Sequence, residues 1–481
     1  MCAVGFSFGR LKSFDRIRKV AAVLEILTGS SISNCQGLHR RAVLRVGSLA
    51  MGGLGLGDLL RLQSRAETRD IWRGKSVVVL FLTGGPSQIE TFDPKMDAPS
   101  DFRSVTGELQ TRIPGVTIGG TFDYLAPLAD RLAMIRSFAH SNSDHTGGVQ
   151  LVMRCGNPTG AGMGSIATRL RGISHPVSGM PTHVYLTSKE TDRQFNKERL
   201  RLLEALGPGQ LGGVYAPFEI GGDDQFQKAV TLRISQRRLD DRLALQRSLD
   251  RLNRQTDATG VREQLDPFAQ QAVDLLLGKS RAAFDLSEED PRLLERYDTG
   301  QYTTGIHANR ASTLGRQLLL ARRLCEAGCG FISIHNPGWD MHGGDTQLNM
   351  PDGMEMLGRP VDRAVSAFLQ DIEQRGLSEK ILFVLTGEFG RTPKIKPNGG
   401  RDHWPRLSTL AFAGGGLRVG QTVGRSTARA EEPQSEPVGV ENLLATVLHT
   451  LFDVPRLRLV ANLPGDLAAL IDRAQPIRQL F

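Results

Sequence analysis

The sequence predicts an α/β fold built around a mainly parallel β-sheet. Continuous runs of apolar, largely β-branched residues recur along the chain, and such runs are typical of strands buried on both faces. Between several of these runs lie segments with apolar residues at three- and four-residue spacing, which predict amphipathic helices. Strands that alternate with helices in this way favour a parallel sheet.

The expected strands follow in chain order. The first, SVVVLFLT at 76–83, ends at the turn-forming sequence GGP at 84–86. Five later runs of the same character are predicted to be strands: residues 132–138, 182–187, 330–335, 380–386 and 408–414. Their β-branched and apolar composition is that of strands in the interior of a sheet.

The clearest helices are predicted in the second half of the chain. Residues 311–328 and 361–376 have helical apolar spacing, and each segment stops at a glycine, Gly328 and Gly376. Residues 233–300 are charged and helical in pattern, and we expect them to form a helical insertion or cap with a solvated charged face. Residues 67–481 are therefore expected to form one α/β domain that carries this insertion.

The first 66 residues carry most of the positive charge. They hold ten Lys or Arg and three Asp or Glu residues, whereas the whole chain has a formal net charge of +8. Arg40 and Arg41 precede a weakly apolar, glycine-rich stretch at 43–60, which predicts a twin-arginine export signal and a periplasmic or secreted protein. This stretch is too short to predict a membrane-spanning helix. A basic amphipathic helix at the start of a cytoplasmic protein is the alternative.

The remainder of the chain is close to neutral. This argues against nucleic-acid binding, which requires a basic face on the folded domain. Three of the five cysteines, Cys155, Cys325 and Cys329, lie beyond the signal region. Their odd number and their spacing fit neither a disulfide framework nor a zinc ribbon, so we expect buried free thiols.

Polar side chains gather in the loops after four of the predicted strands. Because ligands of open α/β sheets bind beyond the carboxyl ends of the strands, we expect these loops to share one site. Carboxylates and imidazoles that meet there favour a divalent metal ion, with zinc as the first candidate and manganese or calcium as alternatives. The candidate residues are Glu90, Asp93, His140, Ser141, His145, Asp340, His342, Glu388, Arg391 and His403. The alternative is that these loops are tight turns in which Asp and His cap backbone groups.

Four motifs appear in a fixed order: FLTGGPSQIETFDPK, SFAHSNSDH, GWDMHGG, and TGEFGRTP followed by GRDHW. Together they resemble the DUF1501 family of bacterial proteins of unknown function, over roughly residues 70–455. That family is grouped with the alkaline phosphatase and sulfatase superfamily. The resemblance therefore implies a doubly wound α/β sheet that binds one or two metal ions.

The resemblance also implies metal-binding roles. Asp340, His342 and His403 resemble the ligands of one ion, and Glu388 stands where a metal-binding Asp is expected. Phe389 stands where the superfamily has a further His, which removes one ligand of a second ion.

Neighbouring loops offer substitutes for the missing ligand. His140 or His145 is the expected replacement, and Glu90 or Asp93 resembles the acidic ligand that follows the first strand.

The resemblance assigns the nucleophile to a hydroxyl group near the start of a helix. Ser141 stands four residues before His145, as the nucleophile of related phosphodiesterases does, and residues 147–153 form the expected helix. Thr146 is the competing candidate, and for either residue helix capping is the structural alternative. Arg391 is expected to hold a non-bridging oxygen of the substrate anion.

The resulting hypothesis is an exported, metal-dependent hydrolase of small-molecule or glycan phosphate esters. Sulfate esters are the second choice, because the sequence lacks the C/S-x-P-x-R stretch of sulfatases in this superfamily. The alternative is a catalytically inactive, alkaline phosphatase-like protein that binds an anionic ligand such as a sulfated glycan.

Overall fold

The computed structural model describes residues 71–187, 194–220, 279–305, 310–344, 347–460, 463, 465–473 and 475–481. All of these residues belong to one compact unit, Thr68–Phe481. The expected signal region at 1–66 and most of the expected insertion at 233–300 lie outside the described residues.

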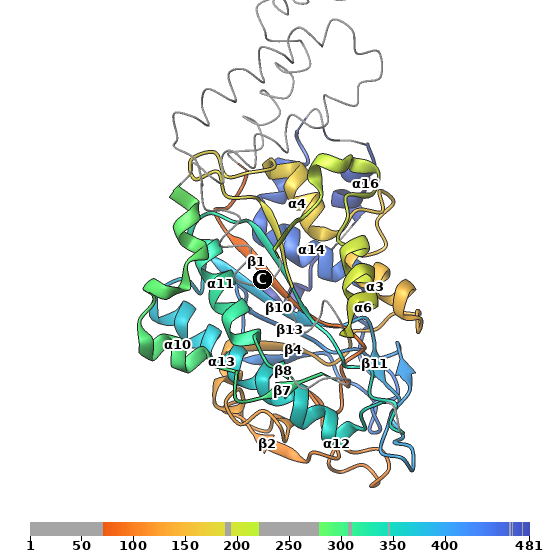
Figure 1. Ribbon diagram of the computed structural model, residues 1–481. Coiled ribbons are helices and arrows are strands. Elements are labelled where there is room, and N and C mark those ends of the chain that lie inside the picture. The colour runs from red at the N-terminus through yellow and green to blue at the C-terminus, as the bar shows by residue number, and fades with distance from the viewer. Residues whose placement is uncertain are drawn as a thin grey trace, which may run out of the picture. The chain divides into compact units, whose positions relative to one another are not determined.

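An eight-stranded sheet forms the centre of this unit (Figure 1). Its strands stand in the order β14 (Gln421–Val423), β4 (Leu132–Ile135), β13 (Leu410–Gly414), β10 (Ile381–Thr386), β1 (Ser76–Leu82), β9 (Phe331–Asn336), β5 (His183–Leu186) and β6 (Phe218–Ile220). The first strand of the chain therefore lies in the middle of the sheet, paired in parallel with both β9 and β10. The predicted fold class, an α/β fold with a mainly parallel sheet, is confirmed.

Within this sheet, β13 runs against its neighbours. It pairs antiparallel with β10 on one side and with β4 on the other. The apolar run at 408–414 correctly predicts a buried strand, but strands of this composition are expected in a parallel arrangement. The direction follows from the connection: residues 387–409 hold only the short hairpin of β11 (Gly390–Arg391) and β12 (His403–Trp404), so no helix returns the chain to the other end of the sheet.

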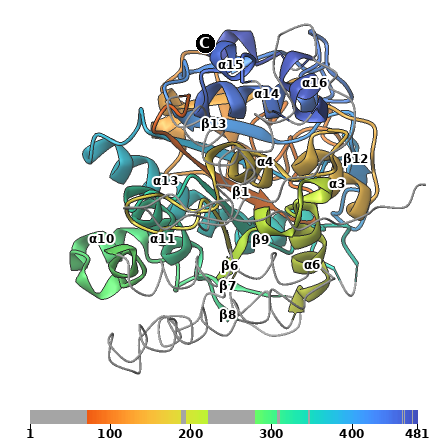
Figure 2. The same cartoon turned by 90° about the horizontal axis from the view of Figure 1, so that it is seen from above.

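Helices cover both faces of the sheet (Figure 2). The side chains of β1 alternate between two cores: Val78 and Leu80 face one, and Val77 and Val79 face the other. This double burial explains why the strand is apolar throughout. One core includes α10 (Pro291–Tyr297), α11 (Leu314–Glu326) and α13 (Arg359–Gln374), and the other includes α3 (His145–Arg154), α4 (Met163–Arg171), α14 (Val440–Leu451) and α16 (Gly465–Arg473).

Shorter elements complete the described part of the unit. They are α6 (Asn196–Ala205), α12 (Met350–Gly353), α15 (Val454–Leu457), and the hairpins β2 (Glu108–Gln110) with β3 (Thr117–Gly119) and β7 (Thr303–Thr304) with β8 (Arg310–Ala311). The three cysteines of the described residues are free thiols, and two of them, Cys155 and Cys329, are buried as predicted, whereas Cys325 is half-buried. Among the described helices, none has the length and apolar character needed to cross a bilayer.

The ends of β1 and β9 are joined by a close backbone approach. The backbone N–H of Trp339 donates to the carbonyl oxygen of Thr83 at 3.0 Å. The next residue, Gly84, has a φ of +117°, and a Cβ atom there would overlap the backbone nitrogen of Asp340 and lie 2.6 Å from the carbonyl carbon of Trp339. Glycine is therefore required at this point, because a side chain would push away the loop that carries Asp340.

We predict that Gly84→Ala destabilises the protein more than Gly74→Ala does. Gly74 also has a positive φ, +69°, but a Cβ there would meet no atom within 4 Å. Strain alone costs about 1–2 kcal/mol at either position, and the overlap at Gly84 adds about 1–3 kcal/mol. Thermal unfolding of the two variants measures the difference. Equal melting temperatures would contradict the predicted close approach.

Candidate metal site at the carboxyl edge of the sheet

Three imidazoles surround one carboxylate beyond the carboxyl ends of β1, β9 and β10. Asp340 and His342 lie in the loop after β9, His145 is the first residue of α3, and His403 begins β12. Residues from three of the four predicted loops therefore contribute to one site, as the strand-end rule predicts.

All three imidazoles direct the Nε2 atom at Asp340. The Nε2 atoms of His342 and His403 lie 2.9 and 3.2 Å from Oδ1 of Asp340, and Nε2 of His145 lies 3.3 Å from Oδ2. The Nε2 atoms of His342 and His403 are 3.0 Å apart. Ligand atoms of His145, Asp340 and His403 all lie within 4.8 Å of one another, which makes this group a candidate metal site.

The opposite ring nitrogen of each histidine faces a hydrogen-bond acceptor. Nδ1 of His145 lies 2.9 Å from Oε1 of Glu388, and Nδ1 of His342 lies 2.9 Å from Oδ1 of Asp402. Nδ1 of His403 lies 2.8 Å from the backbone oxygen of Ser143. Since these partners accept, each Nδ1 carries the proton and each Nε2 keeps its lone pair.

The lone pairs of His145 and His403 and the carboxylate of Asp340 thus converge, with the lone pair of His342 beside Asp340 and His403. Such a set repels itself unless a cation or additional protons lie between its members. Ligand atoms of a tetrahedral zinc site, with bonds of about 2.0–2.1 Å, stand about 3.3 Å apart, close to the separations around Asp340. The donor set therefore fits a divalent metal ion.

Protons take the place of the ion in the metal-free protein. Burial lowers the pKa of His145, but hydrogen bonds with Asp340 and Glu388 outweigh that effect and raise the pKa to about 9. Burial raises the pKa of Asp340, yet hydrogen bonds from His145, His342 and His403 hold this pKa far below its ordinary value. The aspartate is thus ionised at every physiological pH.

Arg391 fixes the position of the carboxylate. Its side chain is 0% exposed, and Nη2 donates to Oδ1 of Asp340 at 2.7 Å. The remaining donors bind backbone oxygens, including those of Gly85 at 2.8 Å and Arg401 at 3.0 Å. Arg391 therefore orients Asp340 from inside the protein, and its burial does not fit the expected contact with a substrate oxygen.

Glu388 orients a histidine in the same way. Its Oε1 accepts from the backbone N–H of Gly84 at 2.7 Å and faces Nδ1 of His145, while its buried Oε2 has no hydrogen-bond partner within the described residues. Phe389, where the superfamily has a histidine, is fully buried, and its ring centroid lies 4.3 Å from that of His403. Glu388 is thus placed behind the imidazole of His145, and Phe389 forms an apolar wall of the site.

Glu90 lies apart from the imidazole cluster. Its carboxylate accepts from the hydroxyl of Ser104 at 2.7 Å and the backbone N–H of Val105 at 3.1 Å, and it pairs with buried Arg401 at 3.3 Å. These contacts hold the loop after β1 in place. The structure does not bring this residue to the metal site.

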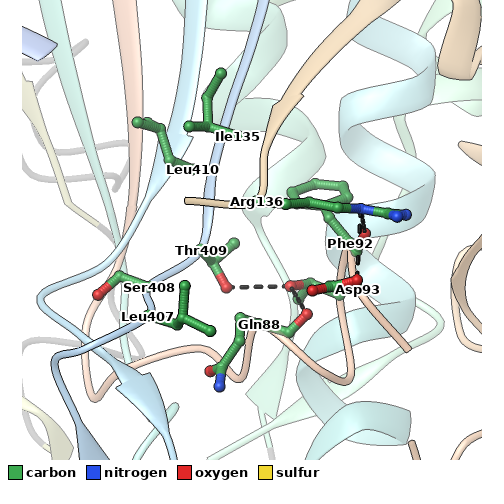
Figure 3. A pocket seen from close by; sticks show the side chains of 10 residues that line it. Gln88, Phe92, Asp93, Ile135, Arg136, Leu407, Ser408, Thr409 and Leu410 are labelled. Atoms are coloured by element: carbon green, nitrogen blue, oxygen red, sulfur yellow. Dashed lines mark hydrogen bonds and ion pairs between the residues drawn. The ribbon is translucent and has the colours of Figure 1, made fainter. Parts of the chain in front are cut away.

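Asp93 lines a separate pocket, shown in Figure 3. It pairs with Lys95 at 3.1 Å and with Arg136 at 3.6 Å, and it accepts a hydrogen bond from the hydroxyl of Ser426. The carboxylate is therefore engaged by two cations and a hydroxyl group rather than by an imidazole. Like Glu90, it is not brought to the imidazole cluster.

The loop before α3 and the first turn of this helix place the predicted residues His140, Ser141 and Thr146 in different surroundings. The ring of His140 contacts the backbone N–H of Asn142 and the hydroxyl of Ser408 at 3.3 and 3.4 Å, and burial lowers the pKa of His140 to about 4. Helix α3 begins at His145 and is capped by Asp144, so Ser141 lies before the helix and is exposed. Thr146 is the hydroxyl-bearing residue of the first turn.

Two site residues escaped the candidate set taken from the sequence. Asp402 orients His342 and is itself paired with Lys396 at 2.8 Å. Glu198, on α6, accepts from the backbone N–H of Gly338 at 3.2 Å. Burial raises the pKa of Glu198 to about 8, and the negative charge of Glu388 adds to the shift. The adjacency of Asp402 to His403 was a usable signal, whereas nothing in the sequence of α6 distinguishes Glu198 from a surface residue.

Three solved structures align with this chain at low similarity. The lipoteichoic acid synthase LtaP from Listeria monocytogenes aligns over 81% of this chain and 77% of its own, with 8% identity and a TM-score of 0.33. The phosphonate monoester hydrolase SpPMH from Silicibacter pomeroyi aligns over 82% and 78%, with 10% identity and a TM-score of 0.31. The PsFucS1 sulfatase from Pseudoalteromonas sp. aligns over 81% and 70%, with 11% identity and a TM-score of 0.27. Similarities this weak carry no argument about chemistry.

The amino-acid sequence identifies the family of this chain. No curated protein sequence matches this chain. Residues 74–481, in contrast, match the family model described as protein of unknown function, DUF1501, which covers every residue of the site. The chain therefore belongs to the DUF1501 family.

Proposed function

We propose that this protein is an exported, zinc-dependent hydrolase of phosphate esters, with sulfate esters as the second substrate class. One observation carries the proposal: three imidazoles, each with Nδ1 bound to an acceptor, aim Nε2 at a single ionised carboxylate. A group of this kind is costly to assemble without an ion, and its position at the carboxyl edge of the sheet is where such folds bind substrates.

Zinc is the ion that this donor set favours. Two imidazole nitrogens and one carboxylate oxygen, from His145, His403 and Asp340, suit zinc, and His342 stands beside them. Manganese and calcium instead prefer a majority of oxygen ligands. We propose one ion, because Oε1 of Glu388 is committed to Gly84 and His145, and Phe389 supplies no ligand. A zinc ion bound there would polarise the ester and lower the pKa of an attacking hydroxyl group or water.

The protein itself would supply orientation and a proton. Arg391 holds the carboxylate of Asp340, and Glu388 and Asp402 hold two of the imidazoles. Glu198, whose pKa is raised to about 8, is protonated at neutral pH and is a candidate donor to the departing alcohol. Ser141 and Thr146 remain the candidate nucleophiles.

Export is proposed on the sequence alone. The paired Arg40 and Arg41 ahead of a glycine-rich apolar stretch support a twin-arginine signal. A reporter fused after residue 66 should reach the periplasm, and replacement of both arginines by lysine should prevent this.

A metal-binding protein without turnover is the second candidate. The burial of Arg391 favours it, because the arginine expected to hold the substrate anion has no exposed surface. Such a protein would bind zinc and an anionic ligand such as a sulfated glycan and release no product.

We predict that Asp340→Ala and His403→Ala abolish zinc binding and turnover together. Each variant removes an atom of the converging group, so zinc measured by elemental analysis should fall from one ion per chain to a trace. Hydrolysis of aryl phosphates and aryl sulfates should fall by at least about 10³-fold.

His449→Ala is the matched control for these variants. His449 lies on α14, away from the edge where the cluster stands, so its loss should change neither zinc content nor rate. Normal zinc content in Asp340→Ala and His403→Ala would refute the metal site. Zinc binding by the wild type without hydrolysis would instead support the second candidate, a metal-binding protein without turnover.

We predict that zinc affinity rises between about pH 6.5 and 9. In the metal-free protein the pKa of His145 is raised from 6.5 to about 9, so a proton competes with zinc across this range. The same raised pKa means that protonation stabilises the metal-free fold fully below pH 6.5 and progressively less up to pH 9.

Two measurements check this pH dependence. Chelator competition at several pH values should show tighter zinc binding as the pH increases, and the melting temperature of chelator-treated protein should fall over the same range. His145→Gln should flatten the second curve. A melting temperature that rises with pH in this window would contradict the prediction.

We predict that Glu198→Gln slows the hydrolysis of esters with poor leaving groups more than that of esters with good ones. A protonated carboxyl group helps an alkoxide depart but matters little for a nitrophenolate, so kcat should fall about 10²-fold for alkyl phosphates and only slightly for nitrophenyl phosphate. Zinc content should be unchanged. A uniform decrease across both substrate types would show that Glu198 only supports the loop at Gly338.

A further inference from the structure

A second pocket lies between the start of α11 and the end of β9, two elements that pack side by side (Figure 2). Its cavity volume is about 20 Å³, and the cavity is partly open to solvent. Ser312, Gln317, Thr304 and Asn336 contribute polar groups to its lining, and neither a carboxylate nor a Lys or Arg side chain lines it among the described residues.

Gln317 is buried in this pocket without a partner for its amide nitrogen. Its residue exposure is 6%, and Nε2 has no hydrogen bond in the described structure. Buried amide groups are nearly always hydrogen-bonded, so an unpartnered one in the wall of a pocket points to a bound acceptor.

Asn336 offers a second donor. Its Oδ1 accepts from Nε1 of Trp339 at 2.7 Å. The indole nitrogen can only donate, so this contact identifies the oxygen and leaves Nδ2 free to donate elsewhere. His335 also reaches the pocket, but the alternation of β9 turns its ring to the opposite face, where it lies near Tyr185.

The start of α11 adds a favourable dipole. This helix has 13 residues, and the backbone N–H groups of Leu314 and Gly315 in its first turn donate to the hydroxyl oxygens of Ser312 and Thr299 at 3.4 and 3.1 Å. The N-terminal end of a helix carries partial positive charge and attracts anions. Amide donors and a helix N-terminus, without any carboxylate, favour an oxyanion over a cation.

We propose that this pocket binds an oxyanion group, phosphate, sulfate or carboxylate, through the side-chain amides of Gln317 and Asn336, close to the positive end of α11. The proposal is independent of the metal site. The two sites are nevertheless adjacent in the chain, because Pro337 lines the pocket and Asp340 follows three residues later. An oxyanion bound here would therefore contact the base of the loop that carries the central carboxylate.

The test uses chelator-treated full-length protein, in which the metal site cannot hold the anion. Titration with inorganic phosphate, sulfate and acetate should show saturable binding by calorimetry and a raised melting temperature. Asp340→Ala should bind equally well. Comparison of inorganic phosphate with phenyl phosphate then distinguishes a site for the free ion from one for an oxyanion carried on a larger molecule.

Gln317→Leu should weaken binding at least about tenfold, because a donor to a charged group is lost. Thr304→Val, which keeps the side-chain shape but removes the hydroxyl group, is a second variant that should also weaken anion binding. Gln374→Leu, at an exposed position in the last turn of α13, is the matched control and should bind as the wild type does.

The removal of an unpartnered amide also gives a stability readout. Without any anion, Gln317→Leu should melt no lower than the wild type, and phosphate should raise the melting temperature of the wild type alone. Absence of binding to all three anions, or unchanged affinity in both Gln317→Leu and Thr304→Val, would overturn the proposal and leave ordered water as the occupant.

Discussion

The convergence of three imidazoles on the carboxylate of Asp340 is the constraint on which the rest of the site depends. Each imidazole is held from behind by an acceptor, and the carboxylate is held from behind by buried Arg391. The partners in these pairs lie between 51 and 260 residues apart in the chain. Only the shared carboxyl edge of β1, β9 and β10 brings them within hydrogen-bond distance, so the site is a property of the sheet rather than of any one loop.

The backbone around Gly84 shows how closely the sheet and the site are coupled. The residue makes room for Asp340, and its N–H binds the carboxylate of Glu388, which in turn orients His145. A substitution of Gly84, at the end of the central strand, would therefore affect the positions of both Asp340 and His145. The pocket at the start of α11 meets the same loop from its other end, at Pro337.

Composition and periodicity predicted the sheet well because strands buried on both faces must be apolar throughout, whatever their order. The direction of β13 was not predictable in this way, since it depends on the connection and not on the strand. Four site residues could be predicted from the sequence, because each follows a strand end or a glycine-rich turn: Asp340, His342, His145 and His403. Glu90 and Asp93 look equivalent by that rule, but their carboxylates meet Arg401 and Arg136 instead, and pairing across the fold leaves no trace in local sequence. Glu198 was missed because an acidic residue on a helix resembles a solvated one.

The ion pair of Arg391 with Asp340 has an electrostatic consequence. It cancels the charge of the central carboxylate, and Lys396 cancels that of Asp402. In the metal-free protein the protonated His145 offsets the charge of Glu388, so the empty site is close to neutral. A dication that displaces this proton would make the local potential positive, and the loaded site would attract anions more strongly than the empty one. The order of arrival would then be fixed by the protein's own charges, with the ion first and an anionic molecule second.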